Sequence, residues 1–158
     1  MKSLLGKLGV ILIGLAIFGY AEVWGQDWRL YGEDPFASYY YDAEKVFQPS
    51  KNIVRVWGKV VYKKDGVTKL VARLGERFKT TSFAIDSSEF DCLKGQYKEL
   101  QRTFFSQKAT YLGEQSDLSW GYVNQGTIQE KLYKIICKSI KEDVESIESK
   151  PSRSKKRK

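Results

Sequence analysis

The 158-residue chain contains no histidine and only two cysteines. The absence of histidine excludes catalysis by Ser-His-Asp or Cys-His groups and every metal site that needs an imidazole ligand. Two cysteines cannot complete a structural zinc site, and these two do not form a Cys-x-x-Cys redox pair. The carboxylates left for hydrolysis or calcium binding show no spacing that selects a catalytic pair or a ligand loop. We therefore predict no enzymatic activity, no metal and no cofactor.

Acidic residues are missing from both ends of the chain, which carry its formal charge of +8. Eight basic residues lie in these two ends, namely Lys2, Lys7, Lys150, Arg153, Lys155, Lys156, Arg157 and Lys158. Without them, 19 basic residues stand against 19 acidic ones, so the body of the chain is neutral by count. A neutral body with mixed signs lacks the basic footprint of a nucleic-acid-binding domain. We therefore expect no nucleic-acid partner.

Residues 1–25 have the organisation of a secretory signal peptide. Lys2 and Lys7 provide a positive n-region, and an apolar segment follows at 8–18. Small residues after this segment offer two candidate cleavage sites. The alternative is a membrane anchor, but the apolar run is shorter than the roughly 20 residues that a spanning helix needs. We therefore predict export, to the periplasm, the cell surface or the medium.

The predicted mature chain divides into one domain at 26–149 and a basic tail at 150–158. The length suits a single domain with its own core. The tail has no apolar residue except Pro151, so we expect it to be disordered. Its basic side chains are candidates for contact with anionic surfaces, and the alternative is a solvated tail.

Residues 52–62 give the clearest strand pattern in the chain. Val54, Val56, Val60 and Tyr62 share one parity, while Arg55, Trp57 and Lys59 share the other, so one face is predicted to lie in the core. Gly58, on the core side, indicates close approach by another element or a bend in the strand. Further strands are predicted at 28–31, 38–42, 82–92 with a bulge near 87–88, 97–105, 109–112 and 118–123, with a connection at 43–50.

Two segments carry helical signals. Residues 67–79 are ambiguous between a strand and a short helix limited by Gly75, with the helix favoured, and 64–66 have the composition of a turn. A second helix is predicted to begin at Thr127, because Thr127 and Glu130 have the spacing of a capping box. Apolar residues, with Cys137 at their edge, share one side of this helix, which should pack against the sheet.

The two cysteines have a natural interpretation in an exported protein. Cys137 lies on the helix side that faces the sheet, and Cys92 lies near a strand end. In an oxidising compartment such a pair is usually a disulfide, and closing this loop would add on the order of 4 kcal/mol of stability. The alternative is two buried free thiols.

Several aromatic and cysteine-bearing segments occur in a distinctive order. They are Trp28, Tyr31-Gly32, 38–42, 52–62, 90–92, Leu132-Tyr133 and Cys137. In this order, from 28 to 138, the chain resembles the bacterial surface-adhesin protein E family. The resemblance implies an α+β fold, in which an antiparallel sheet of about six strands carries a C-terminal helix on its concave face. It also implies one disulfide, which falls here on Cys92 and Cys137.

The resemblance further implies a non-enzymatic, exported binding or adhesion protein. The adhesin that names the family binds host vitronectin, laminin and plasminogen and can dimerise. We therefore expect a macromolecular ligand of the extracellular-matrix or envelope type, and a homodimer is consistent with the resemblance. The alternative is a periplasmic structural or accessory protein of the envelope without adhesin activity.

Aromatic and basic residues on two of the predicted strands are the candidate recognition surface. They are Tyr39, Tyr40, Tyr41, Arg55, Trp57 and Lys59. Tyrosine and tryptophan provide rigid contact area with a polar handle. Trp57 is the strongest member, because strand parity places it opposite the valine face. The alternative is that alternate members of the tyrosine run fill the core while the others cover the strands.

Overall fold

The computed structural model describes residues 26–138 and residue 140. The predicted signal peptide at 1–25 and the basic tail at 150–158 lie outside the described residues. The last residues of the predicted domain, at 141–149, lie outside them as well. The domain boundaries therefore stay predictions.

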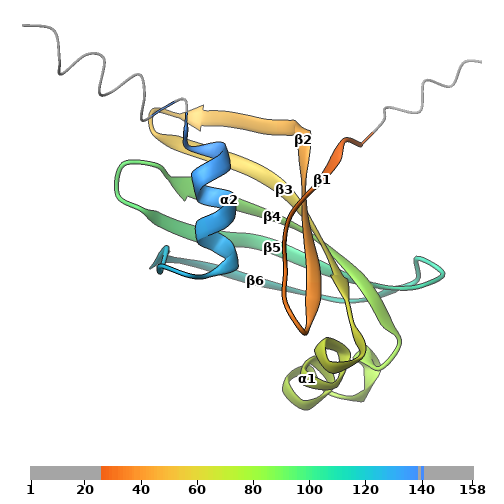
Figure 1. The fold of residues 1–158 in the computed structure, drawn as a ribbon. Coiled ribbons are helices and arrows are strands. Elements are labelled where there is room, and N and C mark those ends of the chain that lie inside the picture. The colour runs from red at the N-terminus through yellow and green to blue at the C-terminus, as the bar shows by residue number, and fades with distance from the viewer. Residues whose placement is uncertain (1–25, 139, 141–158) are drawn as a thin grey trace, which may run out of the picture.

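A six-stranded antiparallel sheet dominates the described part of the chain (Figure 1). Each strand pairs with its neighbour in the chain, so the order is β1-β2-β3-β4-β5-β6. The strands are β1 (Trp28–Glu33), β2 (Ala37–Ser50), β3 (Ile53–Tyr62), β4 (Thr81–Asp91), β5 (Gln96–Ser106) and β6 (Tyr111–Tyr122). The predicted α+β class with about six strands is confirmed, and so is the predicted bulge between Ser87 and Ser88.

β2 is longer than the sequence pattern predicts. The prediction of a connection at 43–50 is wrong, because the strand continues and Val46 and Phe47 pair with β3. The register shifts between Tyr41 and Val46. A register shift changes which residues face the core, so the alternation of apolar and polar residues is interrupted there. The charged residues within the shift also give the segment the composition of a loop.

β6 also differs from its prediction. Residues 109–112 and 118–123 were expected to be two strands, but 111–122 form one. Most of its side chains are exposed, and it lies at the edge of the sheet. An exposed edge strand does not need a continuous apolar face, so its middle carries no clear strand pattern.

The helix α1 (Lys64–Leu74) resolves the ambiguous segment, and a short 3₁₀ helix, η1 (Glu76–Phe78), follows it. Gly75 ends α1 with φ +97°, as expected. The turn predicted at 64–66 is wrong, because these residues form the first turn of α1. Gly66 serves close packing there, since a Cβ would lie 2.1 Å from the carbonyl oxygen of Phe36.

The helix α2 (Ile128–Ile136) begins where the capping signal predicts. The Thr127 hydroxyl accepts a hydrogen bond from the Glu130 backbone N–H at 3.3 Å. The Glu130 carboxylate accepts from the backbone N–H of Gly126 instead of Thr127, so the reciprocal half of the box is displaced by one residue. Cys137 is the C-cap of the helix.

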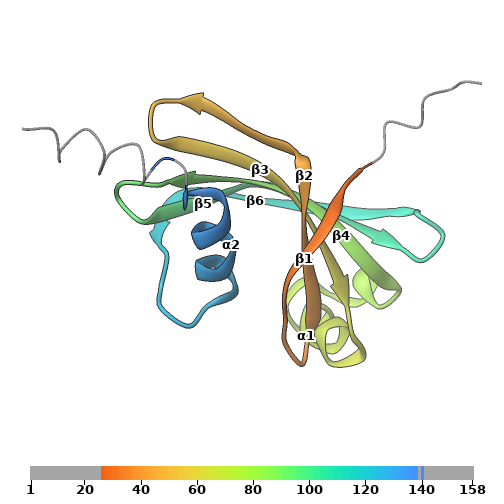
Figure 2. The ribbon, with the colours of Figure 1, turned by 45° about the horizontal axis from the view of Figure 1, so that its top comes forward.

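Both helices lie on the same face of the sheet, one at each end (Figure 2). Under α2, Leu132 and Ile136 pack with Val54, Val56 and Phe90. Near α1, a second cluster joins Leu70, Phe78, Ala84 and Phe104. The parity predicted for 52–62 is confirmed, since Val54 is 3% exposed while Trp57 is 39% exposed.

A disulfide joins Cys92, just after β4, to Cys137, at the end of α2. Both residues are buried, and their Cα atoms lie 5.4 Å apart. The Tyr133 hydroxyl donates a hydrogen bond to the Cys92 carbonyl at 2.8 Å, so the helix also contacts this strand end directly. The predicted disulfide is confirmed.

Replacing both cysteines by alanine should reduce the free energy of unfolding by about 4 kcal/mol, because the unfolded chain loses a long loop constraint. Urea titration of the wild type and the double variant measures this difference. A reducing agent should destabilise the wild type and leave the variant unchanged. Equal urea midpoints for the two oxidised proteins would contradict the prediction.

Candidate functional site

The face of the sheet opposite α1 and α2 carries no helix in the described part of the chain (Figure 2). We call it the open face. β3 contributes Arg55, Trp57 and Lys59 to it, because these residues alternate with the buried valines. Strand pairing extends the open face to Tyr40, Phe47, Glu89 and Lys98, and a contact with Lys98 adds Trp120.

Five open-face side chains form a row that crosses β2 to β6. Register places Phe47 opposite Arg55, Arg55 opposite Glu89, and Glu89 opposite Lys98. Lys98 in turn lies over the ring of Trp120 on β6. We call these five residues the cross-strand row. Directly opposed side chains stabilise a sheet when they are oppositely charged or aromatic, so this row is a stabilising arrangement.

Glu89 is the centre of the cross-strand row and is 7% exposed. Arg55 Nε donates to Glu89 Oε1 at 2.9 Å, and Lys98 Nζ lies 3.0 Å from Glu89 Oε2. Burial alone raises the pKa of Glu89, but hydrogen bonds and charge from Arg55 and Lys98 outweigh it, so the pKa lies below its usual value. The carboxylate therefore stays ionised and holds both cations in place.

The two cations held by Glu89 each lie near an aromatic ring. Lys98 Nζ is 4.7 Å from the centroid of the Trp120 ring, and Arg55 Cζ is 5.5 Å from that of Phe47. Both distances fall within the range of cation–π attraction. The cross-strand row thus presents partly exposed aromatic rings beside fixed positive charge, the residue types that dominate binding hot spots.

Trp57 and Lys59 continue the same chemistry on β3. Lys45 Nζ lies 6.0 Å from the Trp57 centroid. Lys59 Nζ lies 5.2 Å from the Phe83 centroid and 5.9 Å from that of Trp28. Cations therefore lie beside aromatic rings on the open face outside the cross-strand row as well.

The structure separates the predicted tyrosine run. Tyr40 pairs with Lys59 and joins the open face. Tyr41 is buried in the cluster under α2, and Tyr39 donates its hydroxyl hydrogen to Asp34 Oδ2 at 2.9 Å. Arg55, Trp57, Lys59 and Tyr40 are therefore brought together, while Tyr39 and Tyr41 point to the helix side.

Four open-face residues were not among the predicted site residues, namely Phe47, Glu89, Lys98 and Trp120. Phe47 lies in the stretch predicted as a connection, and Glu89 lies in the strand predicted at 82–92, where no spacing singles out one acid. Their spacing in sequence carries no signal, because strand register alone brings them together. Alternation within β4 and β5 would have placed Glu89 and Lys98 opposite the core side.

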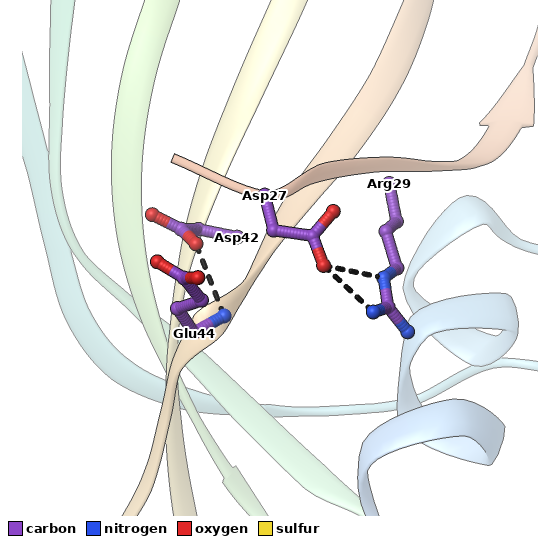
Figure 3. A network of polar contacts seen from close by, with 4 residues as sticks. All are labelled: Asp27, Arg29, Asp42 and Glu44. Carbon is purple, nitrogen blue, oxygen red and sulfur yellow. Dashed lines mark hydrogen bonds and ion pairs between the residues drawn. The ribbon is translucent and has the colours of Figure 1, made fainter. Parts of the chain in front are cut away.

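A polar cluster fixes the bend of β2 beside the open face (Figure 3). Asp42 is fully buried, and its Oδ1 accepts from the backbone N–H of Glu44 at 3.1 Å. Its Oδ2 lies 3.8 Å from Lys45 Nζ, the cation near Trp57. Just before β1, Asp27 Oδ2 accepts two hydrogen bonds from Arg29 of that strand. Among the described residues, no three Cys, Asp or Glu side chains are grouped as a metal site would require.

Comparison with known proteins places the chain in a family. The family model described as surface-adhesin protein E matches residues 28–138. The chain belongs to the surface-adhesin protein E family. The resemblance stated from the sequence is therefore confirmed, over the same residues. No curated protein matches this family member.

Solved structures of protein E from Haemophilus influenzae are similar to this family member. The crystal structure of protein E from the non-typeable organism has 13% identity and a TM-score of 0.48, and the match covers 73% of this chain and 78% of that one. Crystal form II has 15% identity and a TM-score of 0.45, with 65% and 82% covered. Of the helices in the described ranges, none has the length and apolar composition to cross a membrane.

Glu89→Gln should reduce the free energy of unfolding by about 2 kcal/mol at neutral pH, because the two cations lose their charged partner. The folded pKa of Glu89 is depressed, so its contribution is present above the unfolded pKa and is lost as pH falls through the folded pKa. The difference between wild type and variant should therefore shrink in acid.

Urea titrations at neutral and acidic pH measure this effect. Glu44→Gln is the matched control, since Glu44 is exposed, and it should change stability by less than about 0.5 kcal/mol. A Glu89→Gln penalty that is equal at both pH values would contradict the role of the ionised carboxylate.

Proposed function

We propose that this protein is an exported, non-enzymatic adhesion module that holds a macromolecular ligand on the open face of its sheet. The observation that carries the proposal is the cross-strand row, in which buried Glu89 fixes two cations beside aromatic rings. Membership of the surface-adhesin family supports the adhesion class and a location at the cell surface. The complete lack of histidine supports the absence of catalysis.

The chemistry of the open face favours an acidic protein segment as the ligand. Lys45, Arg55, Lys59 and Lys98 lie on or beside it. Of the acids on this face, Glu89 is nearly buried, and Glu114 on β6 accepts a hydrogen bond from Gln101. Carboxylates of a partner would meet cations that are already positioned, which lowers the ordering cost of binding. The aromatic rings would supply the apolar contact area.

Trp57 and Trp120 lie on two separated strands of this surface, with 39% and 40% of their surface exposed. A ligand that covers the open face would contact both. Replacement of either ring by alanine removes contact area without opening a hole in the clusters under the helices. Alanine variants at these two positions therefore test binding without disrupting the core.

Trp57→Ala should weaken capture of the ligand about tenfold or more, and Trp120→Ala should do the same, because each removes a hot-spot aromatic. Surface plasmon resonance on immobilised vitronectin, laminin and plasminogen, the ligands implied by the family resemblance, measures the affinities. Thermal unfolding should show that both variants stay folded, with a loss of no more than about 1 kcal/mol from the cation–π contact that each ring makes.

Ile135→Ala is the matched control for these variants. Ile135 is also an exposed apolar residue, but it lies on α2, away from the open face. Its replacement should leave capture unchanged. Full binding by both tryptophan variants, or loss of binding only with Ile135→Ala, would contradict the proposal. Binding to none of the three matrix proteins, with capture of an envelope component instead, would favour the accessory role.

A further inference from the structure

A polar cleft of about 390 Å³ opens on the helix side of the sheet, opposite the open face. Arg73 of α1 and Gln129 of α2 line it, together with residues of β5 and β6. The two apolar clusters lie under the two helices, and the cleft lies along β5 and β6 between these helices. Lys98 borders the cleft as well, but its ammonium lies on the open face, where it pairs with Glu89.

The cleft exists because β6 leaves regular pairing there. Glu99 pairs with Asp117, and Tyr97 pairs with Gly121. One residue of β5 therefore faces three residues of β6, at 118–120. Such bulges release backbone groups from the ladder and are common beside binding sites. Asp117, Ser119 and Gly121 at this bulge all line the cleft.

Arg102 forms the floor of the cleft and is already neutralised. Its Nη2 lies 2.9 Å from Asp86 Oδ2 and 2.5 Å from Glu99 Oε2. Its Nε is buried and has no hydrogen-bond partner within the described residues. A buried donor without a partner is costly, so this atom is either used by a ligand or poorly compensated. The pair with Asp86 depends on Gly58, where a Cβ would lie 2.0 Å from Asp86 Oδ1.

The lining charges balance. Arg73 and Arg102 stand against Glu99 and Asp117, while the ammonium of Lys98 is paired with Glu89 on the open face. An anion or a cation would therefore find no net attraction. The remaining lining is supplied mainly by amides and hydroxyls, which provide donors and acceptors together: Gln115, Gln129, Ser116 and Ser119.

This chemistry suits a neutral ligand with many hydroxyl groups. Carboxylate, amide and guanidinium groups are planar and carry two polar atoms side by side. Each such group can therefore form two hydrogen bonds to neighbouring hydroxyls of one sugar ring. Tyr97 supplies an aromatic side chain among these polar groups. The volume falls in the range of small-molecule sites, which is roughly 300–1,000 Å³. A monosaccharide or disaccharide fits both the size and the polarity.

We propose that this cleft binds a neutral saccharide of one or two rings, through the amides of Gln115 and Gln129 and the Arg102–Glu99 pair. The binding is independent of the open face. The same neutral sugar chemistry occurs in animal cell-surface glycans and in bacterial wall polysaccharide, so the experiment includes a probe for each source.

Two-dimensional NMR titration of the exported protein tests the proposal with lactose, which represents animal glycans, and with diacetylchitobiose, which represents the bacterial wall. Glucuronic acid serves as the charged comparison. At least one neutral sugar should shift the backbone signals of Glu99, Gln115 and Gln129 in a saturable way. Glucuronic acid should bind more weakly than the neutral sugar.

Gln115→Ala and Gln129→Ala should each lower the affinity for the neutral sugar about tenfold, because a hydrogen-bonding amide is lost. Gln101→Ala is the matched control, since Gln101 lies on β5 but is exposed and bonds to Glu114 outside the cleft lining. Trp57→Ala should leave sugar binding unchanged, which separates this proposal from the adhesion proposal.

Three results would overturn the saccharide site. One is the absence of saturable shifts at the cleft with either neutral sugar at millimolar concentration. A second is tighter binding of glucuronic acid than of the neutral sugars. A third is sugar binding that both glutamine variants retain in full. Weak capture of matrix proteins alongside normal sugar binding would count against the adhesion proposal alone.

Discussion

The disulfide between Cys92 and Cys137 holds α2 against the face of the sheet that strand parity makes apolar. It ties the end of α2 to the end of β4, and Tyr133 adds a hydrogen bond at the same strand end. With α2 held there, Leu132 and Ile136 fill the space over Val54, Val56 and Phe90. The opposite face keeps its cations and aromatic rings in solvent. The disulfide thus secures α2 on the packed side, and the side chains of opposite parity form the open side.

Because side chains alternate along each strand, the two faces of the sheet carry different residues. On β3 the buried Val54, Val56 and Val60 point toward the helices. The residues that alternate with them, Arg55, Trp57 and Lys59, point away. The open face is ordered by one buried carboxylate, Glu89, which holds a cation on each side. The helix side is ordered at its centre by the reverse arrangement, in which Arg102 lies between Asp86 and Glu99. Each surface therefore has a fixed charge near its middle. The counterions of Glu89 come from the two neighbouring strands, whereas those of Arg102 come from β4 and from β5 itself.

The sequence predicts much of this fold because several signals are local. The alternation of 52–62, the cap at Thr127 and the stop at Gly75 each depend on a few adjacent residues, and all are found in the structure. Strand continuity through the bend of β2 is not local, since the register changes there and hides the alternation. The cross-strand row is less local still, because Arg55 and Glu89 meet only through the pairing of β3 with β4. Tyr39 and Tyr41 were grouped with Tyr40 by composition, although strand parity puts neighbours on opposite faces.

The central claim is that a macromolecule is held on the open face and not on the helix side. Hydroxyl-radical footprinting of the exported protein, free and bound to a captured matrix protein, tests it most directly. The account predicts that Phe47, Trp57 and Trp120 lose reactivity on binding, while the exposed side chains of Leu93 and Ile135 keep theirs. Protection of Ile135 with unchanged oxidation of the two tryptophans would contradict it.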